Sequence, residues 1–172
     1  MSSSLWEVQA AEVLLNLEAH RASGLPVSDR LIAEVQRPGQ IFVMMLTRVE
    51  EFFQLVWQSS RETTPLAPPR HPRTLHNCAS RLSQFGWEFD RLVEHGHSWF
   101  STCAGIDKAF DYSKFGFIAV TPLTSSERHE TPEGSYYIYD GVHRSIVLAK
   151  KLLREEIAYS PVQTILLEPR RN

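Results

Sequence analysis

The residues best suited to chemistry lie close together near the end of the chain: Asp140, Gly141, His143, Arg144 and Ser145. The aromatic and β-branched residues before them are typical of a strand, and the apolar spacing after them is typical of a helix. A strand that turns into a helix within two residues leaves unpaired backbone N–H groups at the corner, at the positive end of the helix dipole. The corner is therefore predicted to bind an anion such as phosphate.

Asp140, Gly141 and His143 each allow a chemical and a structural interpretation. Asp140 either holds a divalent metal or orients His143, or it caps the helix while Gly141 serves the turn. His143 has an ordinary pKa of about 6.5, so it suits a general acid or base at neutral pH. Alternatively, its ring packs and forms a hydrogen bond near the start of the helix. Both interpretations stay open on the sequence alone.

Arg144 and Ser145, together with the backbone at Gly141, are the predicted phosphate ligands. A guanidinium in the first turn of a helix opposes the dipole, at a cost of roughly 0.3–1 kcal/mol, whereas a bound anion reverses the sign. Arg144 is therefore expected to serve ligand binding more than folding. On this reasoning, Arg144→Ala is expected to leave thermal stability unchanged or slightly raised.

The pattern Asp140-Gly141-x-His143-Arg144 between a strand and a helix resembles the ParB/sulfiredoxin superfamily, whose members handle nucleotides and, in some branches, cut DNA. The similarity is best over residues 115–171. The size of the chain and its N-terminal portion resemble one branch, the plasmid fertility-inhibition proteins of the Osa type. Proteins of that branch block DNA export by conjugation-like secretion systems.

Weaker agreement with ParB-like domains reaches back to the proline- and arginine-rich run Pro69–Arg73. Within this run, Arg70, His71 and Arg73 lie among prolines and are candidates for a second phosphate clamp. The alternative is an exposed loop with ordinary charges.

The resemblance implies phosphoester chemistry at the corner: nucleotide hydrolysis or DNA cleavage, assisted by Mg²⁺, with ATP as substrate or ligand. Arg144 would hold the phosphate, Asp140 a metal or water, and His143 the proton. The expected partners are DNA, nucleotide and components of a conjugation or type IV secretion system. Two alternatives stay open: a non-catalytic nucleotide- or protein-binding module of the same fold, and a toxin or immunity factor.

One residue of the motif argues against peroxiredoxin repair, the reaction of sulfiredoxins. Those enzymes need a cysteine immediately before the His-Arg pair, and Val142 stands there, which cannot be a nucleophile. Cys78 and Cys103 lie far upstream and are expected to be free thiols of a reducing cytoplasm, unnecessary for activity. Neither has a partner at a usual zinc-ligand spacing.

Length and composition predict a single globular domain. The chain has 172 residues, of which 42% are hydrophobic and 22% charged, and its net charge of -2 gives no overall basic footprint for nucleic acid. Lys150, Lys151 and Arg154, with Arg170 and Arg171, form a local basic cluster that either tracks a nucleic-acid backbone or is a solvated helix face. No apolar run approaches the roughly 20 residues that span a bilayer. We therefore expect a cytoplasmic protein without membrane insertion.

The predicted fold is a single α/β (α+β) domain with a mixed sheet. Residues 1–60 are expected to form a helical N-terminal extension packed on a ParB/sulfiredoxin-like core. Hydrophobic spacing and caps predict helices over Ser4–Arg21, Asp29–Val35, Thr47–Gln58, Leu75–Glu94 with an interruption at Gly86, and Val142–Arg154. Strands are predicted at Ile41–Leu46, Phe115–Val120, Ser135–Asp140 and within Ile157–Leu167, with loops at 59–74 and 124–134.

Overall fold

The structure is a computed structural model that describes residues 5–25, 27–37 and 39–169. Within these ranges the chain has a five-stranded mixed sheet and eight α-helices, which confirms the predicted α+β class. The strands are Leu5–Val8 (β1), Gly39–Leu46 (β2), Ile118–Pro122 (β3), Tyr136–Asp140 (β4) and Val162–Pro169 (β5). The helices are Ala10–Ala22 (α1), Asp29–Val35 (α2), Val49–Phe53 (α3), Leu75–Arg81 (α4), Phe89–Glu94 (α5), Ser101–Lys108 (α6), Ser125–Glu130 (α7) and Val142–Leu153 (α8), with 3-10 turns at Leu82–Phe85 (η1), Ser98–Phe100 (η2) and Tyr112–Lys114 (η3).

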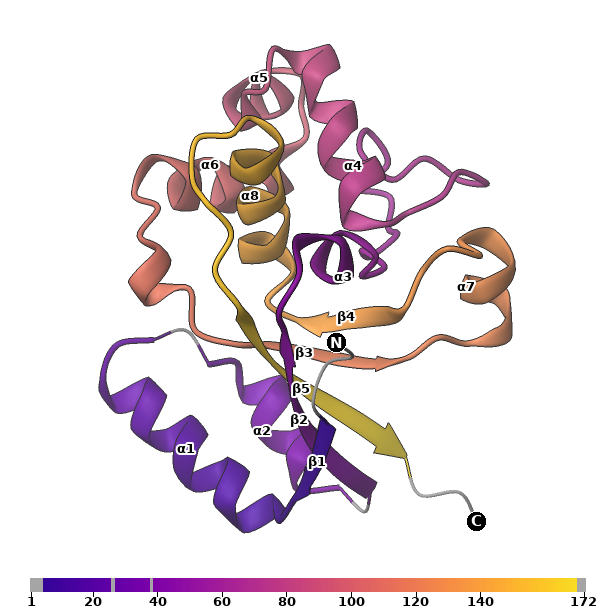
Figure 1. Ribbon diagram of the computed structural model, residues 1–172. Coiled ribbons are helices and arrows are strands. Elements are labelled where there is room, and N and C mark those ends of the chain that lie inside the picture. Colours follow the sequence, from indigo (N-terminus) through magenta and orange to yellow (C-terminus); the bar gives the residue numbers. More distant parts are fainter. Residues whose placement is uncertain (1–4, 26, 38, 170–172) are drawn as a thin grey trace.

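The strand order in the sheet is β1-β2-β5-β3-β4. All neighbours are antiparallel except β3 and β5, which are parallel. Parallel neighbours require a crossover connection. Here the chain passes from β3 through β4 and then through α8 to β5, so α8 makes the crossover. The strand-to-helix corner therefore lies at the end of the edge strand β4, where the chain leaves the sheet (Figure 1).

Helices cover both faces of the sheet. In Figure 1, α1 and α2 lie below it, and α3, α4, α5, α6 and α8 lie above it. Each side has its own apolar core because strands β2, β3 and β5 bury side chains on both faces. The larger core contains Phe52, Trp57, Leu75, Phe89, Phe100 and Ile146 among others, and the smaller one contains Val13, Leu17, Leu31, Val35 and Phe117.

The N-terminal segment differs from its prediction. The helix expected from Ser4 begins only at Ala10, because Leu5–Val8 pairs with β2 as an edge strand. The part of that prediction before Leu5 lies outside the described residues. Residues 1–60 are also more than an added helical extension, since β2 lies inside the sheet between β1 and β5.

The helix predicted to run to Gln58 ends at Phe53. The residues after it pair with the free edge of β4: Val56 N donates to Tyr136 O at 2.7 Å, and Ile138 N donates to Val56 O at 2.9 Å. This pairing satisfies backbone groups that an edge strand otherwise leaves without hydrogen bonds. The segment therefore pairs with β4 and does not continue the helix. It also fixes the strand that carries the corner.

Other predicted elements are confirmed, with a few changes. Helix α2 has the predicted bounds, and the predicted strands β3 and β4 pair. The helix predicted over Leu75–Glu94 is interrupted at Gly86, and residues 59–74 form a loop. The loop 124–134 contains the short helix α7, because Thr124 and Glu127 form a capping box. Helix α6 was not predicted.

Candidate functional site

The predicted strand–turn–helix corner is confirmed, and Gly141 is the residue that permits it. Gly141 has φ 86°, in the left-handed region, and a Cβ there would lie 2.8 Å from the Ile118 side chain. Both the conformation and the close approach require glycine. The first bond of helix α8 joins Ser145 N to Gly141 O at 2.9 Å, and no side chain of the described residues accepts from the amides before it. These amides are the open positive end of a twelve-residue helix.

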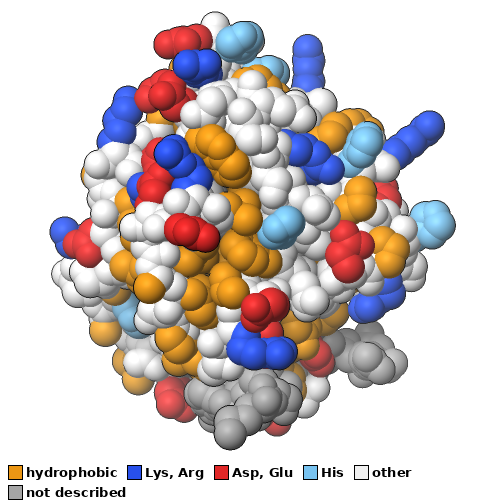
Figure 2. Space-filling view, turned by 45° about the horizontal axis from the view of Figure 1, so that its top comes forward, with side chains coloured by type: hydrophobic (Ala, Val, Ile, Leu, Met, Phe, Trp, Pro, Cys, Tyr) orange, Lys and Arg blue, Asp and Glu red, His pale blue; other side chains and the backbone are white. Residues whose placement is uncertain are grey.

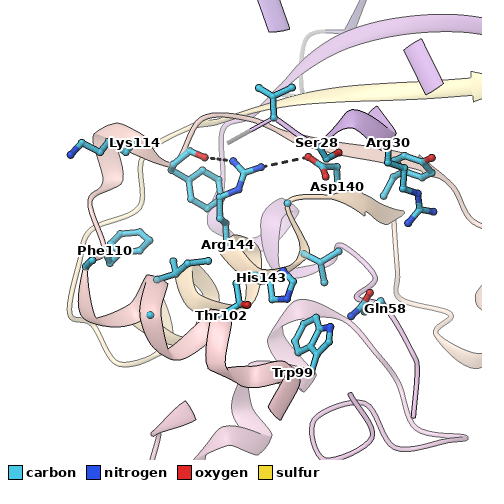
Figure 3. Close-up of a pocket in the computed structure, with 18 of the residues that line it drawn as sticks. Ser28, Arg30, Gln58, Trp99, Thr102, Phe110, Lys114, Asp140, His143 and Arg144 are labelled. Atoms are coloured by element: carbon cyan, nitrogen blue, oxygen red, sulfur yellow. Dashed lines mark hydrogen bonds and ion pairs between the residues drawn. The ribbon is translucent and has the colours of Figure 1, made fainter. Parts of the chain in front are cut away.

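A cavity of about 820 Å³ borders this corner. Its walls come from the end of β4, the first turn of α8, one face of α6, the turn η3 and the segment just before α2. Figure 3 shows Phe110 and Lys114 at one end, Arg30 and Gln58 at the other, and His143 between them. The prediction that the first turn of α8 borders a concave pocket is therefore confirmed.

Arg144 lines the cavity, but most of it is buried, with 9% of its surface exposed. Its Nη1 donates a short hydrogen bond to Phe115 O, and its Nη2 lies 3.7 Å from Asp140 Oδ2 (Figure 3). The guanidinium also lies against two glycines in the left-handed region, Gly116 and Gly141, where a Cβ would come within 3.3 and 3.2 Å of it. Arg144 thus ties the segment before β3 to the β4–α8 corner.

These contacts reverse the expectation that Arg144→Ala leaves stability unchanged. No partner for the guanidinium could be predicted from the sequence, whereas in the fold it contacts the Phe115 carbonyl and the Asp140 carboxylate. Burial lowers the pKa of Arg144, and Asp140 opposes that shift. Phosphate binding by Arg144 stays a prediction, and a structural role is added to it.

His143 is half-buried in the cavity wall and stacks on Trp99, with ring centroids 4.1 Å apart and an angle of 22° between the planes. Trp99 in turn packs edge-on against the buried Trp57, whose Nε1 donates to Val142 O at 3.1 Å. Burial, followed by the positive charge of Arg144, lowers the pKa of His143, although Asp140 opposes the shift. The imidazole is therefore oriented and neutral at pH 7, as a proton acceptor requires.

Asp140 is the residue at the corner that was expected to hold a metal or to cap the helix. It lines the cavity, its side chain is 18% exposed, and Oδ2 pairs with Arg144. Among the described residues no three His, Cys, Asp or Glu side chains gather around a possible metal position. A single carboxylate still fits Mg²⁺ that is held mainly by substrate phosphates and water.

Three predicted phosphate ligands are placed elsewhere. Ser145 is fully buried and its hydroxyl donates to Gly141 O at 2.8 Å, so it stabilises the corner from inside. Arg73 is also buried, and it donates to Trp57 O and Glu130. Arg70 is exposed, and neither Arg70 nor Arg73 lines the cavity. The predicted second clamp is therefore not brought to the corner.

Two members of the predicted basic cluster, Lys150 and Lys151, do not form a charged surface, whereas Arg154 is exposed. Lys150 is buried and pairs closely with Asp107 of α6, and Lys151 contacts Asp107 at 3.0 Å and Glu156 at 3.2 Å. The pairs with Asp107 join α8 to α6, and together with the Glu156 pair they make these two lysines unavailable to a nucleic-acid backbone. Arg170 and Arg171 lie outside the described residues.

Sequence reasoning missed the cationic and apolar parts of the cavity. Arg30 of α2 is exposed and lies over the Tyr139 ring, with Cζ 4.2 Å from the centroid, and Lys114 is exposed at η3. Ile106 and Phe110 contribute apolar wall. Nothing local in the sequence marks these residues, because they reach the corner only through the packing of α2 and α6 beside β4 and α8.

The two cysteines are free thiols, as predicted, and both are buried in the larger core. Burial raises the pKa of Cys78 to about 12 and also raises that of Cys103. Neither lines the cavity. Buried, protonated thiols of this kind are poor nucleophiles.

No protein-family model, curated protein or solved structure matches this chain. No helix in the described part of the chain combines the length and the apolar character needed to cross a bilayer.

Proposed function

We propose that this chain binds a nucleotide in the cavity at the β4–α8 corner and hydrolyses a phosphoanhydride or phosphoester bond of that nucleotide. The observation that carries the proposal is the open amide end of α8, which faces a cavity of about 820 Å³ beside a half-buried histidine. Helix N-termini that open into a cavity are suited to phosphate. The exposed guanidinium of Arg30, which lies over the Tyr139 ring, adds a positive charge at the same end.

His143 is the proposed general base. It takes a proton from a water molecule while the water oxygen forms a bond to phosphorus and the bond from phosphorus to the leaving oxygen breaks. Burial keeps the imidazole neutral, and the stack on Trp99 holds the ring in one orientation. A base fixed in this way contributes about 10²–10⁴ in rate.

Asp140 is the residue that would hold Mg²⁺ at this corner, together with phosphate oxygens and water. The ion would neutralise charge on the phosphates when it is bound. Arg144 fixes the Asp140 carboxylate from the other side and adds its own charge to the phosphate end.

A nucleotide or an unpaired strand end suits the site better than a DNA duplex. Figure 2 shows basic and acidic side chains mixed over the face it presents, around gathered hydrophobic side chains, instead of a continuous basic surface. By the resemblance to fertility-inhibition proteins, we extend the proposal to DNA cleavage that limits conjugation or type IV secretion-dependent DNA transfer.

The test combines calorimetric titration with ATP and a phosphate-release assay, each with and without Mg²⁺. His143→Gln is expected to bind ATP with nearly normal affinity and to release phosphate about 100-fold more slowly. His129→Gln is the matched control, because His129 is exposed on α7 and does not line the cavity. A His143→Gln variant that hydrolyses ATP at the normal rate would refute the assignment.

A second candidate is a nucleotide-binding module without hydrolysis. It is favoured by one observation: the Arg144 guanidinium is engaged by Phe115 O and Asp140 within the protein. ATP binding without phosphate release in the unchanged protein supports this second function. If ATP does not bind at all, both candidates are wrong.

A further inference from the structure

Gly105 is a glycine inside helix α6 that neither the backbone nor close packing requires. Glycine in the interior of a helix is less favourable than alanine because it loses more chain entropy on folding. Gly105 is not one of the glycines with positive φ, and a Cβ built on it would meet nothing within 4 Å. The open space beside it is the cavity at the corner.

The residues of α6 and its C-terminal end that line this cavity include several with short side chains or none. Thr102, Gly105 and Ala109 are exposed, lie at helical spacing and line the cavity with only short side chains. Ile106 and Phe110 stand beside them, half-buried and packed on the larger core. The short side chains, with an aliphatic and an aromatic side chain beside them, leave an apolar recess lined by Thr102, Gly105, Ile106, Ala109 and Phe110.

The recess lies away from the phosphate end. Figure 3 places Phe110 and Lys114 at the end opposite Arg30 and Gln58, with Thr102 and His143 between them. Gly105 lies on α6 between Thr102 and Ala109, the residue that follows the helix, so it belongs to the apolar part of the cavity. A ligand with phosphates at the α8 amides would extend its other end toward this recess.

We propose that this recess seats the nucleobase of the nucleotide, and that Gly105 is the residue that leaves room for the ring. The inference rests on the proposed function, because phosphates held at the corner determine which end the base occupies. Bases offer π-faces that pack on aromatic and apolar side chains, here Phe110 and Ile106. The Thr102 hydroxyl, which forms no hydrogen bond with another described residue, is available to the polar edge of the base.

An inorganic phosphate chain would use only half of this cavity. Phosphate groups are strongly hydrated and gain nothing from apolar walls, so Gly105, Ile106 and Phe110 have no role in binding tripolyphosphate. The base and the phosphate chain can therefore be separated by experiment. ATP and tripolyphosphate carry the same phosphate chain, and only ATP carries the base.

The experiment measures calorimetric affinities of ATP and tripolyphosphate for the unchanged protein and for Gly105→Trp. An indole at position 105 fills the recess, so we expect ATP to bind at least about tenfold more weakly and tripolyphosphate to change by less than about twofold. Gly105→Ala is expected to melt a few degrees higher, because alanine favours the helix and its Cβ meets open space. Ser101→Trp is the matched control, since Ser101 is exposed on the same helix and does not line the cavity.

Ala109→Trp, which adds an indole to the same recess, provides a second blocking variant should Gly105→Trp fail to fold, as judged by circular dichroism and gel filtration. The proposal is overturned if the folded blocking variant binds ATP normally, or if it loses ATP and tripolyphosphate equally. Equal affinities of the unchanged protein for the two ligands would overturn the base site alone. If neither ligand binds, the proposed function fails and the base site falls with it.

Discussion

Replacing Arg144 by alanine is the most informative perturbation of the corner, because the fold and the site make opposite demands on this residue. The sequence alone places a charge against the helix dipole and predicts no loss of stability. The structure buries the same guanidinium, with Nη1 bonded to Phe115 O and Nη2 3.7 Å from Asp140 Oδ2. We therefore expect Arg144→Ala to lower the stability of the protein.

The size of the loss follows from these contacts. A hydrogen bond to a charged group contributes about 1.5–3 kcal/mol. The partly exposed ion pair with Asp140 adds no more than about 1 kcal/mol, and relief of the unfavourable dipole returns roughly 0.3–1 kcal/mol. The middle of each range gives a net loss of about 2 kcal/mol, which for a chain of 172 residues lowers the melting temperature by roughly 4–8 °C.

The assay is thermal unfolding combined with ATP titration of the same variant, measured well below its melting temperature. Arg154→Ala is the matched control, because Arg154 follows the same helix, is exposed and, among the described residues, pairs only with Glu156. Its loss therefore changes stability by less than about 1 kcal/mol. An Arg144→Ala protein that melts like the unchanged one and binds ATP about tenfold more weakly would refute the structural role. A protein that melts early and binds ATP normally would refute the phosphate role.

Three further outcomes are expected. Gly141→Ala loses at least about 1–2 kcal/mol in urea unfolding, because its φ is left-handed and its Cβ meets Ile118 at 2.8 Å; an unchanged midpoint would contradict the corner geometry. The pKa of His143 is lowered in the fold, so the folded protein binds fewer protons than the unfolded chain just below about pH 6.5. The stability that neutral His143 contributes is present above that pH and is lost as the pH falls through the lowered pKa. If the free energy of unfolding varies with pH in the same way for the unchanged protein and for His143→Gln, the lowered pKa is contradicted. Cys78 and Cys103 are expected to resist a thiol reagent at pH 8 until the protein is unfolded, and rapid labelling of the native protein would contradict their burial.

The parts of the fold that were predictable are those in which local sequence and tertiary packing agree. Helix α2 begins at a Ser28 cap and ends as its apolar spacing predicts, and α8 has a continuous apolar face. The prediction that the helix continues after Phe53 was wrong, because the pairing of Val56 with β4 is a long-range contact. The predicted helix over Leu5–Val8 was wrong for the same reason, since these residues form a strand by pairing with β2.

The candidate site was predictable in its centre and not in its walls. The corner residues are consecutive, so a strand, a glycine and a helix were enough to place Asp140 and His143 beside open amides. Arg30 and Gly105 come from helices remote in sequence, and only the packing of α2 and α6 brings them to the cavity. Arg73 has the right chemistry for phosphate, but the fold uses it to bond Trp57 O and Glu130.

The Asp-Gly-x-His-Arg pattern therefore combines residues with two kinds of task. Gly141 and Arg144 shape the corner, one through its backbone conformation and the other through a buried hydrogen bond. His143 makes no comparable hydrogen bond to another described residue, and its ring remains in the cavity wall with a lowered pKa. A protein that only binds nucleotide would still need the first two residues to build the amide end of α8. It would not need a neutral, stacked imidazole there, so a variant of His143, and not of Arg144, separates hydrolysis from binding.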